Sequence, residues 1–421
     1  MTNRADQEHH QSRDLVHAVK AHPQGSYYPP LCENAKTVVA IWNELAPYRL
    51  HFLKRVRREA PEIRLVNVFT HSVVNNSMPW AMDVPPEIDV RHDPSCRAHF
   101  GVLANWESVR LHRWTMEILR KERPVLALIA GHDELSRWLT LLRAPGLGLP
   151  LVHHSDSNIF SQPRPGGLRS SVRSLYLRTI MSRVSAVMPA GTAGRAYYRC
   201  YARRAVPEYL CPLEPNYVEL ENGDSEAEAT FRATHGLSEN RRRFLSSGRL
   251  VPVKQISMLI DAFATIANEA HDWDLLIAGG GPLREQLESR VPAGLRNRVK
   301  FLGFLQSGEL RHCYRSCDAL VHAAADEPWG LVINEAVASG LAVIATDITG
   351  AAIDLVRHNV NGFLTPPGSP ESMSAAMLAM SQGDTCARLR GNARRCLRDW
   401  RTSADPVDGL RAAVQHFTSD V

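Results

Sequence analysis

Two carboxylates, Glu327 and Glu335, stand eight positions apart on either side of a glycine-containing turn. An apolar run over residues 319–324 precedes Glu327 and predicts a buried strand, and the apolar helical pattern that begins after Gly330 contains Glu335. A turn between a strand and a helix start directs free backbone N–H groups and the positive end of the helix dipole at an anion. Carboxylates accept hydrogen bonds from sugar hydroxyls. The pattern therefore predicts a site for a phosphate with a sugar on either side, as in a nucleotide sugar.

The stretch 326–340 resembles the Glu-x7-Glu motif of retaining, family-4 glycosyltransferases, which have the GT-B fold. The resemblance extends from about Phe244 to Pro367, and several motifs occur there in the family's order. It implies an α/β protein with two doubly wound, Rossmann-like domains that face each other across a cleft. It also implies a UDP-, GDP- or ADP-sugar as the donor substrate, a hydroxyl-bearing acceptor and no cofactor.

Cleavage of a nucleotide sugar leaves a diphosphate whose growing negative charge must be stabilised. The loop after the strand expected at residues 244–247 carries Arg249 and Lys254, where the family has an Arg and a Lys that bind the diphosphate. Two surface cations at a helix start are the alternative, but a helix N-terminus disfavours cations unless an anion is also there. The backbone N–H groups expected to hold the phosphate are those of Gly330, Leu331 and Val332.

The resemblance gives the two carboxylates different roles. Glu335 matches the residue that accepts hydrogen bonds from the ribose hydroxyls, and its apolar neighbours make a tolerated helix carboxylate a poor alternative. Glu327 matches the residue that contacts the donor sugar on the face where the acceptor attacks; its alternative is an exposed loop carboxylate. In retaining members the leaving phosphate assists the incoming hydroxyl, so we assign no catalytic base. We expect Glu327 to stabilise positive charge on the sugar ring, with Arg249 and Lys254 as its catalytic partners.

A glycine-rich turn at residues 278–282 follows an expected strand and opens an expected helix. Taken alone it indicates a tight strand-to-helix turn, and Arg284 stands where a dinucleotide fingerprint would have its third glycine. In context it resembles the family's Gly-x-Gly-Pro turn, which places Gly280 and Gly281 at the nucleotide pocket.

Gly303 and Phe304 resemble the family's Gly-Phe turn, whose backbone meets the base of the donor without identifying it. The chain departs from the family pattern at residues 323–325, which are all alanine where Pro-Ser is common, and at residues 349–354, which replace a Gly-Gly-x2-Glu segment. Because of both departures, the resemblance does not identify the donor sugar.

Asp272 and Asp274 form the chain's Asp-x-Asp triplet, a segment that binds a metal in some glycosyltransferases. The triplet falls where a strand begins, at the opposite end of the sheet from the expected cleft. We therefore interpret it as a polar strand entry and expect no metal site.

Three residues are candidates for the acceptor or sugar site. Arg49 belongs to a Pro-Tyr-Arg segment that resembles polysaccharide-assembly members of the family, and packing support is its alternative role. His154 and Asp156 follow a later strand and resemble the segment that lines the acceptor and sugar pockets. A lone His is more often structural than functional.

Apolar strands that alternate with helical patterns predict two parallel sheets, each covered on both faces. A Pro-containing stretch at residues 211–217 is the expected crossing between them. The expected limits are a polar tail over 1–36, an acceptor-binding domain over 37–212, a donor domain over 213–396, and a helix over 397–421 that returns to the first domain.

The 421-residue chain has a formal net charge of +5 that is unevenly spread. Residues 157–207 contain nine arginines and no Asp or Glu. We expect the segment 164–204 to contact an anionic membrane surface, with an anionic acceptor or a solvated helix face as the alternatives, and we expect no nucleic-acid partner. No run of 18 apolar residues exists, and the first 36 residues lack a signal-peptide core. The expected location is cytoplasmic, peripheral to the inner face of the membrane.

These features favour a metal-independent, retaining glycosyltransferase that moves a sugar from a nucleotide diphosphate to a hydroxyl acceptor in cell-surface glycan or glycoconjugate synthesis. A GT-B nucleotide-sugar epimerase is a second enzyme hypothesis, against which the separated Glu pair argues. A catalytically silent nucleotide-sugar-binding partner is the third hypothesis. It requires a defect in the donor site, where every expected charged group is present.

Overall fold

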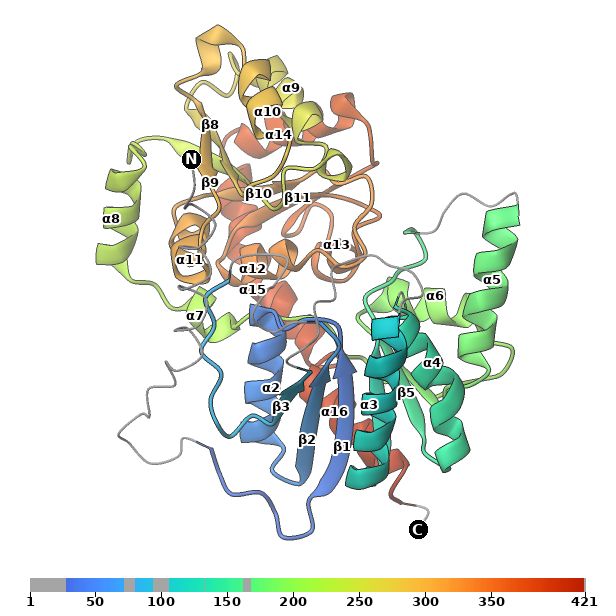
Figure 1. Ribbon diagram of the computed structural model, residues 1–421. Helices are drawn as coiled ribbons and strands as arrows, with labels where there is room; N and C mark the ends of the chain where they lie inside the picture. Colours follow the sequence, from blue (N-terminus) through green and yellow to red (C-terminus); the bar gives the residue numbers. More distant parts are fainter. Residues whose placement is uncertain (1–27, 72–79, 94–105, 133, 162–167, 420–421) are drawn as a thin grey trace, which may run out of the picture.

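The computed structural model describes residues 28–71, 80–93, 106–132, 134–161 and 168–419. Two six-stranded sheets organise the described chain, and every strand pair in both is parallel. Figure 1 shows the two sheets in separate halves of the molecule, with helices around each. The predicted fold, two doubly wound α/β units, is confirmed. The predicted tail over residues 1–36 lies mostly outside the described residues.

The first unit has the strand order β3-β2-β1-β4-β5-β6. Its strands are β1 (Lys36–Trp42), β2 (Ile63–Phe69), β3 (Val90–His92), β4 (Leu126–Ala130), β5 (Leu151–Ser155) and β6 (Ala186–Pro189). Its helices are α2 (Pro47–Glu59), α3 (Trp106–Glu122), α4 (Leu135–Arg143), α5 (Leu168–Met181) and α6 (Thr192–Tyr201), with a 3-10 turn at Ala144–Leu147.

The second unit repeats this order as β12-β11-β10-β7-β8-β9. Its strands are β7 (Arg242–Ser247), β8 (Trp273–Ala278), β9 (Val299–Gly303), β10 (Ala319–His322), β11 (Ala342–Thr346) and β12 (Gly362–Thr365). Its helices are α7 (Tyr217–Glu221), α8 (Ser225–Thr234), α9 (Ile256–Ile266), α10 (Arg284–Arg290), α11 (Ser307–Arg315), α12 (Leu331–Ala338), α13 (Gly350–Leu355), α14 (Pro370–Ser381) and α15 (Thr385–Arg401). Two 3-10 turns lie at Pro252–Lys254 and Ala293–Leu295.

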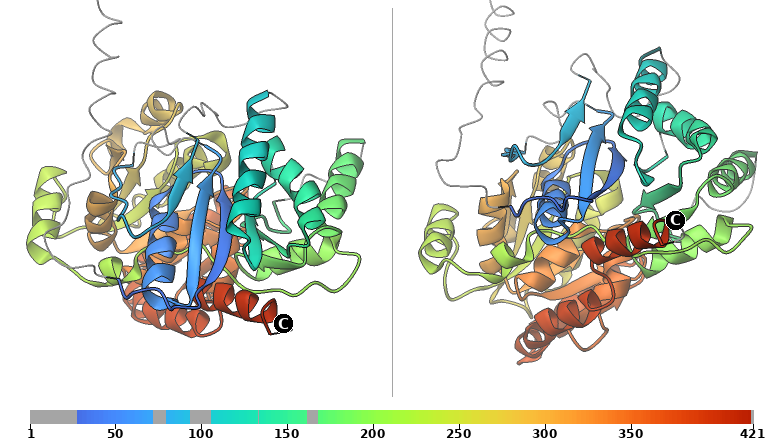
Figure 2. Two further views of the ribbon diagram at one scale, coloured as in Figure 1. Left: turned by 60° about the horizontal axis from the view of Figure 1, so that its bottom comes forward. Right: turned by 90° about the horizontal axis from the view of Figure 1, so that it is seen from below.

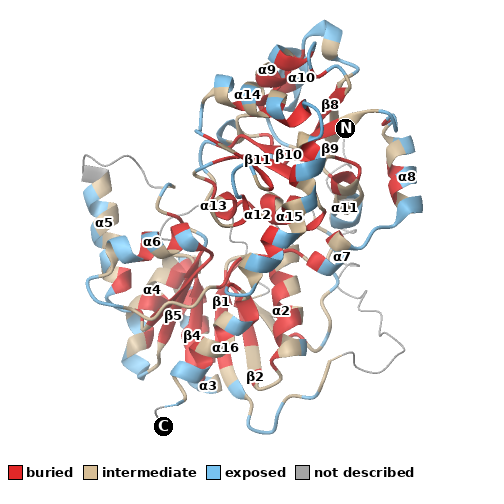
Figure 3. Ribbon diagram, turned by 180° about the vertical axis from the view of Figure 1, so that it is seen from behind, coloured by how far each residue is buried: buried red, intermediate tan, exposed pale blue. Residues whose placement is uncertain are grey.

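Helices cover both faces of each sheet, and this explains why the strands are apolar on both sides. Successive strand residues point to opposite faces, so Phe244 and Leu245 of β7 enter different hydrophobic clusters. Figure 3 shows the buried residues concentrated in the strands and on the inner faces of the helices. The predicted apolar stripe of α9 is buried in one of these clusters: Ile256, Leu259, Ile260, Phe263 and Ile266.

The end of the chain differs from the single helix expected over residues 397–421. Leu397 lies in α15 and packs in the second unit. The helix that packs on the first sheet is α16 (Pro406–His416), which buries Leu410 and Val414 against that unit's core. Asp405 is the N-cap residue of α16, because its side chain accepts hydrogen bonds from the first N–H groups of that helix. Figure 2 shows α16 beside the strands of the first unit.

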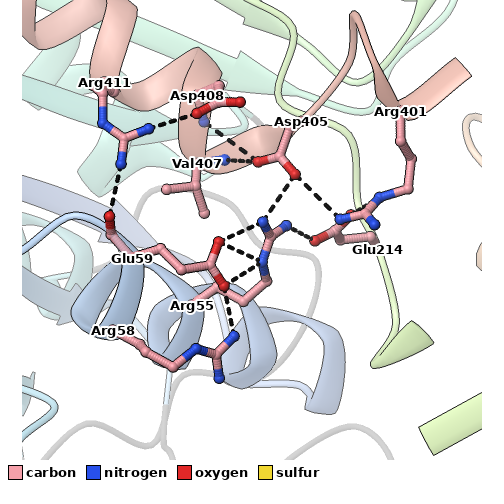
Figure 4. A network of polar contacts seen from close by, with 9 residues as sticks. All are labelled: Arg55, Arg58, Glu59, Glu214, Arg401, Asp405, Val407, Asp408 and Arg411. Carbon is pink, nitrogen blue, oxygen red and sulfur yellow. Dashed lines mark hydrogen bonds and ion pairs between the residues drawn. The ribbon is translucent and has the colours of Figure 1, made fainter. Parts of the chain in front are cut away.

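A buried ionic network ties both chain crossings to α2 (Figure 4). Arg55 donates to Glu214, which lies in the first crossing, and to Asp405 in the second, at 2.9 Å. The same guanidinium pairs with Glu59 at 2.6 Å, and Arg401 lies 3.2 Å from Asp405. Because Glu214 is 2% exposed, its charge depends on these partners. The network thus fixes both crossings on one helix.

No helix within the described ranges is both long and apolar enough to cross a bilayer.

Candidate active site

The second sheet brings two loops together at its carboxyl edge, because β7 and β10 are neighbouring strands. The loop after β7 contains Arg249 and Lys254, and the loop after β10 contains Glu327. The strand order reverses at this point, which is the usual ligand position in a doubly wound sheet. The predicted diphosphate cations and the predicted sugar-binding carboxylate therefore come from adjacent loops.

Residues 326–330, the donor loop, end in a turn that only glycine can form. Gly330 has φ 89° and is the N-cap residue of α12. A Cβ atom on Gly330 would lie 2.8 Å from Thr349 Cγ2 and 3.0 Å from Glu327 Cγ. The backbone N–H groups of Leu331 and Val332 follow in the first turn of α12, at the positive end of its dipole. A turn of this kind suits an anion, and the phosphate expected here stays a prediction.

Glu327 is held by two groups from different elements. Lys254 donates from Nζ to Glu327 Oε2, and His322 Nε2 lies 3.2 Å from the same oxygen. Burial alone would raise the pKa of Glu327, but the hydrogen bond and charge of His322, together with the ammonium of Lys254, lower the pKa to about 2. Glu327 is therefore an anion at every physiological pH.

The glycine turn after β8 packs against the loop that contains Arg249. Leu250 N donates to Gly280 O at 2.8 Å, and a Cβ atom on Gly281 would lie 2.6 Å from Leu250 O. A Cβ atom on Gly280 would meet no heavy atom within 4 Å. Glycine at position 281 is thus required by backbone packing, whereas position 280 has free space beside it. Arg249 itself is exposed.

Glu335 lies in α12, beyond the turn, in a different environment from Glu327. Tyr314 of α11 donates from its hydroxyl to Glu335 Oε2 at 2.7 Å. Burial raises the pKa of Glu335 to about 7, and the hydrogen bond from Tyr314 only partly offsets this effect. The two carboxylates of the motif therefore have widely separated pKa values, because within the described part of the chain only Glu327 has a cationic partner.

A cavity of about 460 Å³ opens beside Glu335 and Tyr314. Both units line it, with Tyr48 and Lys54 from α2 opposite Leu310 from α11. Its lining includes neither Glu327 nor Lys254. The cavity therefore adjoins Glu335 and not Glu327.

The Gly303–Phe304 turn meets the first unit. Gly303 has φ 75°, and its carbonyl accepts from Gly279 N at 2.7 Å. The Phe304 ring lies 4.9 Å from the Trp80 ring, centroid to centroid, and Ala81 N donates to Gln306 Oε1 at 3.3 Å. The turn expected at the base is therefore also an interdomain contact.

The acceptor-side candidates lie together at the carboxyl edge of the first sheet. Arg49 is buried and donates from Nε to Glu44 O at 3.1 Å, and its guanidinium carbon lies 4.3 Å from the Trp42 ring centroid. His154 Nε2 lies 3.1 Å from Cys211 O. Burial and then the charge of Arg49 lower the pKa of His154 to about 4, so this side chain is neutral. Asp156, which follows β5, is exposed.

Both carboxylates of the Asp-x-Asp triplet have arginine partners. Asp272 lies 2.8 Å from Arg242, and Asp274 lies 2.8 Å from Arg241. Both stand at the entry of β8, away from the carboxyl edge. These ion pairs give the triplet a structural role.

Several arginines of the segment 164–204 also have partners. Arg195 and Arg199 pair with Glu208, and Arg204 donates to Val184 O at 3.0 Å. The side chains of Arg164 and Arg169 lie outside the described residues. Exposed arginines in or next to α5 are Arg178 and Arg183, beside the exposed apolar side chains of Val172 and Leu175.

Three site residues went unrecognised in the sequence: His322, Tyr314 and Asn158. His322 ends β10 only five positions before Glu327, so its place at a strand end was an available signal. Tyr314 and Asn158 reach the site from α11 and from the first unit, and no local pattern marks either.

Residues 227–396 match the family of glycosyl transferases group 1. The chain is 35% identical over 150 residues to MJ1607, an uncharacterised glycosyltransferase of Methanocaldococcus jannaschii; the match covers 35% of this chain and 38% of that protein. It is 27% identical over 367 residues to the D-inositol 3-phosphate glycosyltransferase of Jonesia denitrificans, covering 82% of this chain and 85% of that enzyme.

Among solved structures, HepE of Anabaena in complex with UDP superposes with a TM-score of 0.67 at 19% identity. The superposition covers 91% of this chain and 100% of HepE. At this identity the likeness is one of fold, and both units take part in it.

Proposed function

We propose that the chain is a GT-B glycosyltransferase that transfers a sugar from a nucleoside diphosphate to a hydroxyl acceptor with retention of configuration and without a metal. One observation carries this proposal: the Gly330 turn separates an anionic Glu327, paired with Lys254, from a buried Glu335 beside a nucleoside-sized cavity. A nucleotide sugar has the matching order of groups, with its diphosphate between two sugars.

The diphosphate would bind at the start of α12. Backbone N–H groups of the first turn stabilise its inner oxygens, and Arg249 and Lys254 supply positive charge from the loop after β7. Lys254 would then divide its hydrogen bonds between the leaving group and Glu327. This arrangement stabilises charge on the diphosphate as the bond to the sugar breaks.

Glu327 would lie against the sugar ring. Its low pKa keeps the carboxylate charged, so it stabilises the positive charge that develops at the ring in the transition state. The acceptor hydroxyl attacks from the face on which the diphosphate leaves, and the departing phosphate oxygen takes the hydroxyl proton. This front-face reaction needs no protein nucleophile.

Glu335 would hold the ribose. Its carboxylate would accept hydrogen bonds from ribose hydroxyls while Tyr314 occupies one of its oxygens. The base would extend toward Gly303 and Phe304, and contact through their backbone leaves the identity of the base open.

The acceptor would enter from the first unit, where Arg49, His154 and Asp156 surround the carboxyl edge of the sheet. Arg49 and His154 are buried whereas Asp156 is exposed, so Asp156 is the candidate most accessible to a hydroxyl group. We place the acceptor among growing cell-surface glycans, lipid-linked intermediates and small metabolites.

A membrane surface is the proposed partner of α5, which stands at the outer edge of the first unit (Figures 1 and 2). Val172 and Leu175 are 58% and 65% exposed, and Arg178 and Arg183 lie near them. Apolar side chains with adjacent cations suit an anionic bilayer surface. Binding to anionic but not to neutral liposomes, reduced in Leu175→Ser, is the expected result. Equal flotation with both lipids at low salt contradicts this partner.

The function is tested first by thermal shift with UDP, GDP, ADP and their glucose conjugates, each with and without EDTA. UDP leads the panel because HepE binds it. One nucleotide series should raise the melting temperature, and EDTA should not remove the effect. NMR of the transfer product should then show a retained anomeric configuration. An inverted product, or activity that a divalent ion restores after EDTA, contradicts the proposed mechanism.

A further inference from the structure

Asn158 belongs to the first unit but binds the backbone of the donor loop in the second. Its Nδ2 donates to the carbonyl oxygens of Glu327 at 3.1 Å, Pro328 at 2.9 Å and Ile348 at 3.3 Å. Its Oδ1 accepts from the backbone N–H groups of Phe160 at 2.8 Å and Ser161 at 2.7 Å. The side chain is 1% exposed, and both ends of its amide are engaged.

Neighbouring contacts reach the same loop from the first unit. From the first unit, Ser161 Oγ donates to Asp326 Oδ1, and in the crossing between the units Leu213 O accepts from Trp329 Nε1 at 2.9 Å. A Cβ atom on Gly191 would lie 2.6 Å from the Trp329 ring, so the two units approach closely here. The donor loop is therefore held by the first unit along most of its length.

We propose that Asn158 is a positioning residue, which places the Glu327 carboxylate at the donor sugar only while the two units keep this relative arrangement. This inference rests on the proposed role of Glu327. Three carbonyl groups converge on one amide, and their direction fixes the two peptide planes that follow Glu327 and Pro328. A displacement of about 1 Å at a reacting group can lower a rate by about a hundredfold.

A purely structural role would make Asn158 equivalent to other buried loop amides. Asn361 provides the matched control, because it is 0% exposed and engages the same kinds of group. Its Nδ2 donates to Leu355 O at 2.9 Å, and its Oδ1 accepts from Arg357 N at 2.7 Å. All of these contacts lie within the second unit, away from the donor loop.

The test compares the full-length chain with its Asn158→Ala, Asn158→Asp and Asn361→Ala variants. Hydrogen exchange of residues 326–333 needs no ligand, and we expect it to rise about tenfold in both Asn158 variants, as the loss of one or two hydrogen bonds allows. Asn361→Ala should leave that segment unchanged. Unchanged exchange in Asn158→Ala, or an equal rise in Asn361→Ala, overturns the proposal. If Asn158→Ala does not fold, Ser161→Ala takes its place, because it removes the exposed hydrogen bond from the first unit to Asp326. Unchanged exchange of residues 326–333 in that variant overturns the proposal as well.

Two further measurements separate positioning from binding. UDP affinity by calorimetry should change less than about threefold in Asn158→Ala, whereas UDP release from UDP-glucose should fall about a hundredfold. Equal losses of affinity and turnover contradict a positioning role. If the wild-type chain binds no nucleotide at all, the proposed function fails, and the exchange result still decides whether Asn158 fixes the loop.

Discussion

Lys254 and Glu327, which are 73 positions apart in the chain, form an ion pair in which the ammonium donates to Glu327 Oε2. Their side chains are 17% and 14% exposed, so the pair is partly shielded from water. The diphosphate proposed for this site would compete with Glu327 for the same ammonium. The charge on the leaving group and the charge beside the sugar are therefore linked through one lysine.

Glu327→Gln should lower kcat by about 10²–10³, because a neutral amide does not stabilise positive charge on the sugar ring. The affinity for UDP should remain within a few-fold of wild type, since the carboxylate acts in the transition state. Steady-state kinetics and calorimetry on the same preparation measure both quantities. Glu288→Gln, at an exposed carboxylate in α10, is the control. Near-normal turnover in Glu327→Gln removes this residue from the mechanism.

Lys254→Ala should weaken UDP binding about tenfold, because a charge-assisted contact to the diphosphate is lost. The same change should raise the pKa of Glu327, since the ammonium that helps to lower this pKa disappears. Lys300→Ala serves as the control, because this lysine binds the His235 and Gly236 carbonyl groups instead. Unchanged UDP affinity in Lys254→Ala, measured by calorimetry, eliminates the diphosphate assignment.

The affinity for UDP should depend on the protonation of Glu335. Its pKa of about 7 means that the carboxyl is neutral below pH 7 and must lose a proton to accept both ribose hydroxyls. Affinity should therefore rise by up to tenfold per pH unit up to about pH 7 and level off above it. In the Glu335→Gln variant, any pH dependence that comes from the UDP phosphate itself remains. The part of the pH dependence that comes from Glu335 should be lost. If both proteins show the same pH dependence, Glu335 does not bind the ribose.

Arg55→Met should destabilise the protein, because it leaves the buried Glu214 with fewer counter-charges. The loss of one partner of a buried ion pair costs about 3–5 kcal/mol. Since burial already raises the pKa of Glu214, lowering the pH should protonate this group and reduce the loss. Thermal melts at pH 5.5 and pH 8 test this expectation, since the variant should lose less stability at pH 5.5 than at pH 8. The double variant Arg55→Met/Glu214→Gln should recover part of the melting temperature, and no recovery would place the loss elsewhere.

The sequence by itself determined the two parallel sheets and the donor-site glycines. Strand runs such as residues 319–324 are apolar on both faces, and that pattern suits few structures other than a covered parallel sheet. Glu327, Gly330 and Glu335 are close in sequence, so one local motif fixes their order along a strand end, a turn and a helix. Local backbone preferences and hydrophobic patterning are sufficient for such features.

Only the tertiary structure decided which groups surround Glu327 and Glu335. Lys254, Tyr314 and Asn158 reach these carboxylates or their loop from other elements, and one of them comes from the other unit. The separation of the two pKa values depends on burial and on partners that are distant in sequence. Electrostatic environment and side-chain hydrogen bonds act through space over a few ångströms, so sequence spacing alone does not encode them.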